Sequence, residues 1–245
     1  MRIKKHIPNA LTTLNLICGL ISIISTFEGN LTWASLFVFI AAVFDYLDGT
    51  AARLLKVYSE LGKQLDSLAD LVSFGVAPGM IIYHLLSVNG EGSPYVLDQM
   101  HIIPYFALLV PVCSALRLAK FNIDLKQTVN FIGLPTPANA LFFVAIPLVL
   151  YVQPEMYSIV YIPGMVDFFS NPRILTILTV FFSYLLISDF WIFSMKFKSM
   201  KWAGNQVRYI FLMISFVLAL LFFLQAIPMI IVLYVLMSVF FQQGG

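Results

Sequence analysis

The sequence predicts an all-α protein: a polytopic transmembrane helical bundle of about eight spans. Hydrophobic residues make up 60% of its 245 residues and charged residues only 11%, with a mean hydropathy of +0.92. Apolar runs near the ~20 residues needed to cross a bilayer recur along the whole chain. A soluble domain does not have enough interior to bury that much apolar surface, so an integral membrane protein is expected.

The apolar runs define the expected helices in chain order. The first has a basic start like a signal peptide, but no small-x-small cleavage pattern follows it, so we expect a retained helix. The last two form a tight hairpin about Gln225 and Pro228. No soluble domain fits between the runs, so residues 1–245 are expected to form a single transmembrane domain. The expected spans are 8–27, 32–55, 64–88, 102–121, 134–152, 173–195, 208–225 and 228–242.

Basic residues in alternate connections predict the sidedness. They lie before the first span and between spans two and three, four and five, and six and seven. The opposite side carries Arg173 among acidic residues. By the positive-inside rule both termini are cytoplasmic, in the plasma or inner membrane of the cell. The basic residues on the cytoplasmic side are Arg2, Lys4, Lys5, Arg53, Lys56, Lys63, Arg117, Lys120, Lys126, Lys196, Lys198, Lys201 and Arg208.

The stretch "DYLDGTAARLLKVYSELGKQLDSLAD", residues 45–70, gathers four aspartates in an otherwise apolar chain. Asp45 and Asp48 are three residues apart and share a helical face. Gly62, Asp66 and Asp70 follow at spacings of four, and they also share a face. If spans two and three pack as an antiparallel pair, the four carboxylates converge at the cytoplasmic edge of these spans.

Converging carboxylates in a partly dry site must be protonated, paired or bound to metal. Ligands that are all oxygen, with no histidine or cysteine nearby, suit Mg²⁺, Mn²⁺ or Ca²⁺. Two divalent ions would balance four carboxylates, and two ions beside Arg53 would hold a diphosphate. One DxxD motif alone would be ordinary at a solvated helix end. Two spaced pairs with interleaved glycines favour the metal site.

The stretch resembles the signature of the CDP-alcohol phosphotransferases, D-x2-D-G-x2-A-R-x8-G-x3-D-x3-D, at every fixed position. This family of membrane enzymes makes phospholipids. The resemblance implies that Asp45, Asp48 and Asp66 bind one metal ion, and that Asp45, Asp66 and Asp70 bind a second. It also implies that Asp70 is the general base for the acceptor hydroxyl, and that CMP leaves. The implied contacts to the CDP moiety are Gly49, Arg53 and Ser59.

Three further segments resemble the integral-membrane phosphatidylserine synthase branch: "IPNALTTLNLICG", "SALRLAKFNID" and "FIGLPTPANA". This resemblance implies CDP-diacylglycerol or a related CDP-lipid as donor and L-serine as acceptor. The implied partners are membrane lipid and a second copy of the chain in a homodimer, with no nucleic acid. Sister enzymes that use glycerol phosphate or inositol phosphate stay open as the alternative. A prenyltransferase or a transporter fits less well, because all four acids lie at one edge of one helix pair.

The remaining site residues each have two interpretations. Arg117 and Lys120 are placed to bind the serine carboxylate, or they anchor the chain at the membrane surface. Asn122 is a further acceptor contact or a helix-end cap. Asn9 and Thr12 reach the cytidine or cap the first helix. Asp189 is expected as a buried acid in the sixth span that binds the serine ammonium or pairs with a basic loop residue.

Overall fold

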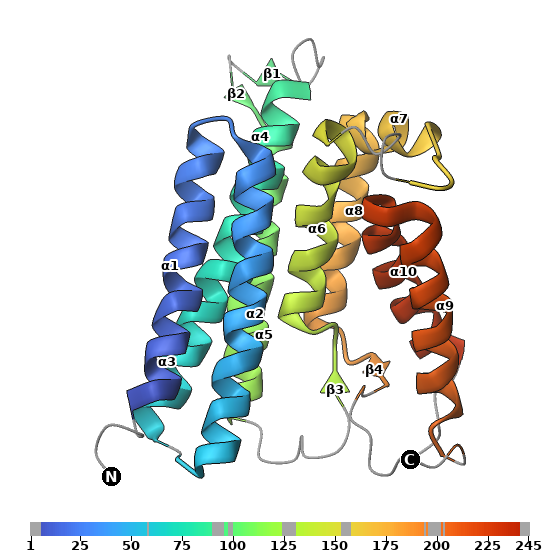
Figure 1. The fold of residues 1–245 in the computed structure, drawn as a ribbon. Helices are drawn as coiled ribbons and strands as arrows, with labels where there is room; N and C mark the ends of the chain where they lie inside the picture. The colour runs from blue at the N-terminus through green and yellow to red at the C-terminus, as the bar shows by residue number, and fades with distance from the viewer. Residues whose placement is uncertain are drawn as a thin grey trace.

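The computed structural model describes residues 6–57, 59–89, 96–97, 100–123, 131–152, 158–193, 195, 202 and 204–240. Over these residues the protein is almost wholly helical, and the longer helices lie side by side as a bundle (Figure 1). Five of them are long and apolar enough to cross a membrane, or six if a bent pair counts as one span. The chain is therefore an integral membrane protein, as the composition predicted.

Each of the eight predicted spans corresponds to a helical segment. The last long helix, Gln206–Phe240, breaks at Phe223, whose φ is 48°, so that its two halves pack against each other as the predicted hairpin. The third span bends through a π-helix between two α-helices. The segments are α1 (Ile7–Phe27), α2 (Leu31–Leu55), α3 (Glu60–Asp70) with η2 (Leu71–Val76) and α4 (Ala77–Asn89), η3 (Ile103–Leu108) with α5 (Leu109–Ile123), α6 (Thr136–Tyr151), α8 (Pro172–Ile187), α9 (Gln206–Phe222) with η5 (Phe223–Gln225), and α10 (Ala226–Phe240).

The sixth predicted span, 173–195, was too long. Helix α8 ends at Ile187, and Ser188 takes an extended conformation. The following residues form the short strand β4 (Trp191–Ile192), which pairs antiparallel with β3 (Phe131–Ile132). This pairing satisfies backbone groups that a continued helix would have paired internally. Asp189 therefore lies outside the helix, and its side chain is 82% exposed, so the expectation of a buried acid was wrong.

Two small elements on the opposite end of the bundle were not predicted. Helix α7 (Gly164–Ser170) meets α8 at an angle of 77°. Strands β1 (Val96–Leu97) and β2 (Met100–His101) form a second antiparallel pair. Both lie at the end remote from the start of α1, where Figure 1 places α7 and β1.

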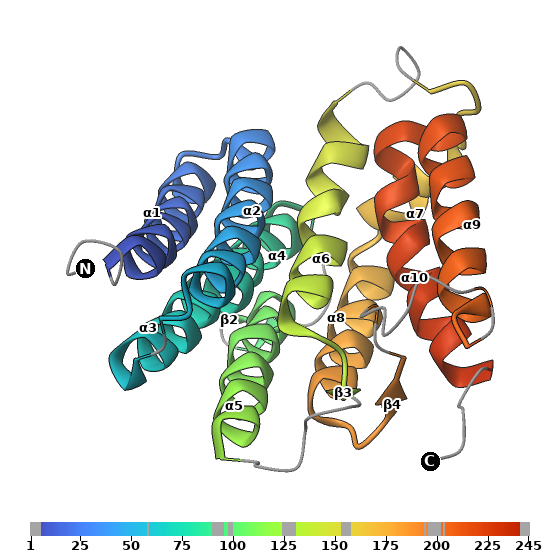
Figure 2. The same cartoon turned by 60° about the horizontal axis from the view of Figure 1, so that its bottom comes forward.

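Helix α6 provides the centre of the packing. Nearly every residue from Asn139 to Val149 on it is buried, and it contacts α2, α4 and α10. Phe142 stacks on Phe182 of α8 with ring centroids 3.9 Å apart. Figure 2 shows α6 between the group α1–α5 and the group α8–α10. The outer helices expose leucine, isoleucine and phenylalanine side chains, as expected for surfaces that face lipid.

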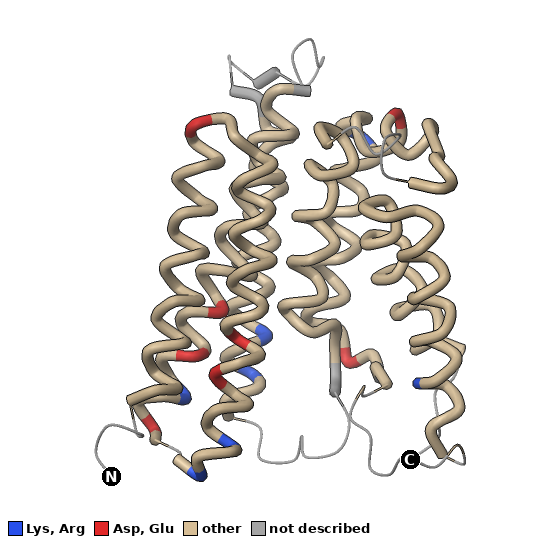
Figure 3. The backbone as a smooth tube through the Cα atoms, in the orientation of Figure 1, with Lys and Arg blue, Asp and Glu red and all other residues tan. Residues whose placement is uncertain are grey.

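Charged residues follow the predicted asymmetry wherever the structure describes them. Figure 3 shows Lys and Arg gathered at the end of the bundle where α1 begins, near most of the Asp and Glu residues. Several charges that defined the predicted sidedness lie outside the described residues: Arg2, Lys4, Lys5, Lys126, Lys196, Lys198, Lys201, Glu91, Asp98 and Glu155.

Candidate active site

Three carboxylates of the predicted cluster meet between α2 and α3. Asp45, Asp48 and Asp66 each offer an oxygen within 4.8 Å of the other two. Asp48 is only 5% exposed, and the Thr12 hydroxyl of α1 donates to its Oδ2 at 2.6 Å. The structure thus brings three of the four predicted carboxylates together. Helices α2 and α3 hold them there by packing on the same helix, α1. Three carboxylates this close in a partly buried site need a compensating positive charge.

The turn between α2 and α3 brings these acids together. Lys56 takes a left-handed conformation with φ 53°, which ends α2. Ser59 then caps α3, because its hydroxyl accepts from the Gly62 backbone N–H at 3.0 Å. A Cβ on Gly62 would lie 2.9 Å from the Ser59 hydroxyl and 3.0 Å from Asn9 Oδ1. A side chain at position 62 would therefore displace the Ser59 or Asn9 side chain, so glycine allows α1 to approach the start of α3 closely.

Asp70 lies beside this trio rather than within it. Its Oδ1 accepts from the Asn15 side-chain amide of α1 at 3.2 Å, and its carboxyl group also interacts with Asp45. The π-helix η2 begins at the next residue, and its Ser73 hydroxyl donates to the Asn15 carbonyl at 3.0 Å. Two contacts thus fix Asn15 against the segment that carries Asp70. The contact of Asn15 with Asp70 was missed from the sequence, although a polar residue in an apolar span was a signal for it.

A cavity of about 530 Å³ opens beside the carboxylates, and the structure brings the predicted CDP-contact residues together around it. Asp48 and Asp66 lie on its wall. Gly49 faces open space, since a Cβ there would have no neighbour within 4 Å. The Arg53 guanidinium contributes a positive charge and donates to Thr50 at 3.2 Å. The lining residues are Pro8, Asn9, Thr12, Asp48, Gly49, Ala52, Arg53, Val57, Ser59, Gly62, Lys63, Asp66 and Phe121.

Neither Asn9 nor Thr12 caps the first helix, so that interpretation was wrong. Helix α1 begins at Ile7, and its cap residue His6 makes no side-chain capping bond. Thr12 lies in the second turn, where its hydroxyl contacts Asp48 and the Pro8 carbonyl. Asn9 lines the cavity opposite Gly62.

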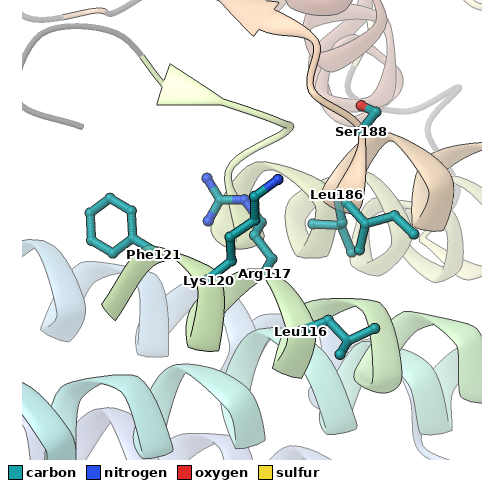
Figure 4. Close-up of a pocket in the computed structure, with 7 residues that line it drawn as sticks. Leu116, Arg117, Lys120, Phe121, Leu186 and Ser188 are labelled. Atoms are coloured by element: carbon teal, nitrogen blue, oxygen red, sulfur yellow. The ribbon is translucent and has the colours of Figure 1, made fainter. Parts of the chain in front are cut away.

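A second, smaller cavity of about 240 Å³ lies between the ends of α5 and α8. Figure 4 shows Arg117, Lys120 and Phe121 projecting from α5 and Leu186 and Ser188 from the α8 side. The Arg117 Nη1 donates to Thr136 of α6 at 3.2 Å, and its Nε is buried with no hydrogen-bond partner among the described residues. Arg117 also interacts electrostatically with Asp70.

Lys120 and Asn122 have partners within the protein. Lys120 Nζ pairs with Asp189 at 2.6 Å. Asp189 therefore pairs with a basic residue as expected, but this residue lies in the last turn of α5 and not in a loop. The Asn122 amide donates to the Ser67 hydroxyl of α3 at 2.9 Å. Asn122 therefore joins two helices instead of capping its own.

The arrangement has the parts needed to act on a phosphorylated ligand. A close group of oxygen ligands suits a hard divalent cation. A cation-bearing cavity adjoins it, and a separate carboxylate, Asp70, lies next to a second basic cavity. Phosphoryl-transfer sites combine metal-clamped phosphates with a group that receives a proton.

Comparison with known proteins places this arrangement in a family. Residues 5–182 match the model of the CDP-alcohol phosphatidyltransferases. This range contains every lining residue of the larger cavity and the α5 residues of the smaller one. The chain belongs to this family. Its activity is thus a transfer reaction of phospholipid biosynthesis, in agreement with the resemblance carried by residues 45–70.

Named relatives extend the comparison. The chain is 38% identical to the CDP-diacylglycerol–serine O-phosphatidyltransferase of Bacillus subtilis, over 75% of this chain and 87% of that protein. It is 35% identical to the archaetidylserine synthase of Methanothermobacter thermautotrophicus, over 55% of this chain and 54% of that protein. The serine phosphatidyltransferase of Saccharomyces cerevisiae is 37% identical over 55% of this chain and 50% of the yeast protein. The alignments with the archaeal and yeast proteins therefore cover about half of each.

Proposed function

We propose that this protein transfers the phosphatidyl group of CDP-diacylglycerol, or of a related CDP-lipid, to the hydroxyl of L-serine, giving phosphatidylserine and CMP. The observation that carries the proposal is the meeting of Asp45, Asp48 and Asp66 beside a cavity lined by Gly49, Arg53 and Ser59. The names of the bacterial, archaeal and yeast relatives support serine as the acceptor.

The carboxylates fit a pair of divalent ions, Mg²⁺ or Mn²⁺. Asp45, Asp48 and Asp66 would hold one ion, and Asp45, Asp66 and Asp70 the other. The mutual distance of the first three and their oxygen-only chemistry support this assignment. When bound, such ions neutralise the diphosphate and the charge that develops on it during transfer.

The protein's own residues would position both substrates. Arg53, Gly49 and Ser59, with Asn9 and Thr12, bind the CDP moiety in the larger cavity. Asp70 receives the proton of the serine hydroxyl as its oxygen attacks the phosphatidyl phosphorus. The bond from phosphorus to the CMP oxygen breaks opposite the attack.

The smaller cavity would bind the rest of the acceptor. Arg117 has a buried Nε with no hydrogen-bond partner in the part of the chain that the structure describes, and it interacts electrostatically with Asp70, which suits it to the serine carboxylate. Lys120 and Asn122 are occupied by Asp189 and Ser67, so we place them at the edge of this subsite rather than at its centre.

We further propose that the chain acts as one domain over residues 1–245 and as a homodimer in the plasma or inner membrane. Both termini and the active site would face the cytoplasm, where serine and CMP are soluble. The concentration of basic residues at the end of the bundle that holds the site supports this orientation.

The deciding experiment offers the purified protein CDP-diacylglycerol with Mg²⁺ or Mn²⁺ and one labelled acceptor at a time: serine, glycerol phosphate or inositol phosphate. We expect label in lipid from serine alone, loss of turnover with EDTA, and recovery when either metal is returned. Faster incorporation of a phosphorylated alcohol would assign the chain to a sister activity. Full turnover after thorough chelation would remove the metal assignment.

A further inference from the structure

The two cavities share one lining residue, Phe121 of α5. The larger cavity otherwise draws its walls from α1, α2, α3 and the turn before α3, and the smaller one from α5 and the end of α8. Phe121 follows Arg117 by four residues, so the two side chains lie on the same face of α5. Its ring stands beside Lys120 and Arg117 in Figure 4. An apolar ring, 40% exposed, therefore lies where the cavity beside Asp48 and Asp66 meets the cavity that holds Arg117.

Both neighbours of Phe121 in the chain are tied to other elements. On one side, Lys120 pairs with Asp189 beyond α8. On the other, the Asn122 amide donates to Ser67, and the Asn122 carbonyl accepts from Lys63 Nζ at 3.3 Å. The end of α5 is thus joined to α3 and to the segment after α8 on either side of the ring. An exposed ion pair contributes little stability alone, but these contacts together restrict where the ring can lie.

A transferase of this kind must keep water from its phosphoryl group. Water is a competing nucleophile, and attack by its oxygen would form a bond to phosphorus, break the same bond to CMP and lose one proton to a base, with phosphatidic acid as the wasted product. Closing a site against water prevents such side reactions. An apolar side chain where the two cavities meet, beside Lys120 and Arg117, is placed to limit the water there.

We propose that Phe121 is the partition between the nucleotide cavity and the acceptor cavity, and that it directs the phosphatidyl group to the acceptor hydroxyl instead of to water. This inference rests on the proposed transferase activity. Asn122 acts through Phe121, as a positioning residue that holds the ring in place.

The test compares transfer with hydrolysis in the full-length protein. CDP-diacylglycerol, Mn²⁺ and labelled serine are supplied, and phosphatidylserine and phosphatidic acid are measured in the same reaction. In Phe121→Ala the ratio of hydrolysis to transfer is expected to rise by roughly tenfold or more, because the acceptor is less well placed and water gains access. Phe121→Leu keeps apolar bulk and should raise the ratio less. Asn122→Ala should raise it in the same direction.

The matched control is Val112→Ala, which changes an exposed residue of the same helix that lines neither cavity. It should leave the ratio unchanged. If Phe121→Ala lowers both products equally, or leaves the ratio at the wild-type value, Phe121 is not a partition. A wild-type protein that makes neither product from CDP-diacylglycerol would instead overturn the proposed function.

Discussion

At the scale of single residues, the carboxylates of the site differ in their surroundings. Asp45, Asp48 and Asp66 lie close enough to share a cation. Asp70 accepts a hydrogen bond from Asn15, and it interacts electrostatically with Arg117. This difference supports separate roles, in which the first three bind metal and Asp70 also accepts a proton.

The roles predict different effects of equivalent substitutions. Asp70→Asn keeps the shape of the side chain but removes the proton acceptor, so serine transfer should fall by roughly 10² or more while CDP-lipid still binds, although more weakly. Asp45→Asn should lose both transfer and binding, because Asp45 would contact both ions. The measurements are CDP-lipid affinity in the presence of Mn²⁺ and the transfer rate for each variant. Near-normal transfer by Asp70→Asn would place the base elsewhere.

The sequence predicted that Asp45, Asp48 and Asp66 lie together but not all of their contacts. The spacing of three and four residues was enough to put Asp45 with Asp48, and Asp66 with Asp70, on shared faces. The contacts Thr12–Asp48 and Asn15–Asp70 join residues 36 and 55 positions apart, and helical periodicity contains no information about such pairs. They depend on the rotation of α1 against its neighbours.

At the scale of elements, hydrophobicity placed the helices well and their ends less well. Apolar residues continue past Ile187, so the predicted sixth span ran to 195. The chain instead leaves the helix there, and its backbone pairs with residues from 131 onward. This pairing joins segments about sixty residues apart and was beyond a local pattern. It also explains why Asp189 is exposed beside Lys120 instead of buried in a helix.

The junction between these segments depends on Gly133. Its φ is +76°, and a Cβ there would lie 2.7 Å from the Leu186 carbonyl oxygen. Its N–H donates to the Phe190 carbonyl at 2.8 Å, and the next N–H, of Leu134, donates to the Leu185 carbonyl at 2.9 Å. The start of α6, which carries the Arg117 partner Thr136, is fixed to the end of α8 by these bonds.

Gly133→Ala should therefore destabilise the protein by about 1–2 kcal/mol from the left-handed backbone alone, with a further cost from the contact with the carbonyl. The measurement is the midpoint of thermal unfolding in detergent. Gly164→Ala serves as the control, because a Cβ at Gly164 has no neighbour within 4 Å. An equal midpoint for the two variants would show that the junction tolerates a side chain and that its geometry is not required.

At the scale of the whole molecule, the polar site lies toward one end of an apolar bundle. Helices α1, α2, α3 and α5 surround it with polar and charged groups. The rest of the bundle, from α6 to α10, supplies buried aromatic packing such as Phe142 on Phe182. The location suits an enzyme with one lipid substrate and one soluble substrate, because both can reach the membrane surface.

This architecture makes a prediction about topology. Lys56 ends α2 beside the candidate site, and Asp167 lies on α7 at the opposite end of the bundle; both are exposed. The native cysteines Cys18 and Cys113 are buried and would first be replaced by alanine. A cysteine at Lys56 should then react with a membrane-impermeant maleimide only after the cytoplasmic face is opened, and a cysteine at Asp167 should react in intact cells or spheroplasts. The reason is that basic residues are retained on the cytoplasmic side during insertion, and they gather at the Lys56 end.

Labelling of both positions from the same side would contradict the eight-span arrangement. Labelling of Lys56 alone from outside would keep the bundle but invert it, and would separate the site from cytoplasmic serine.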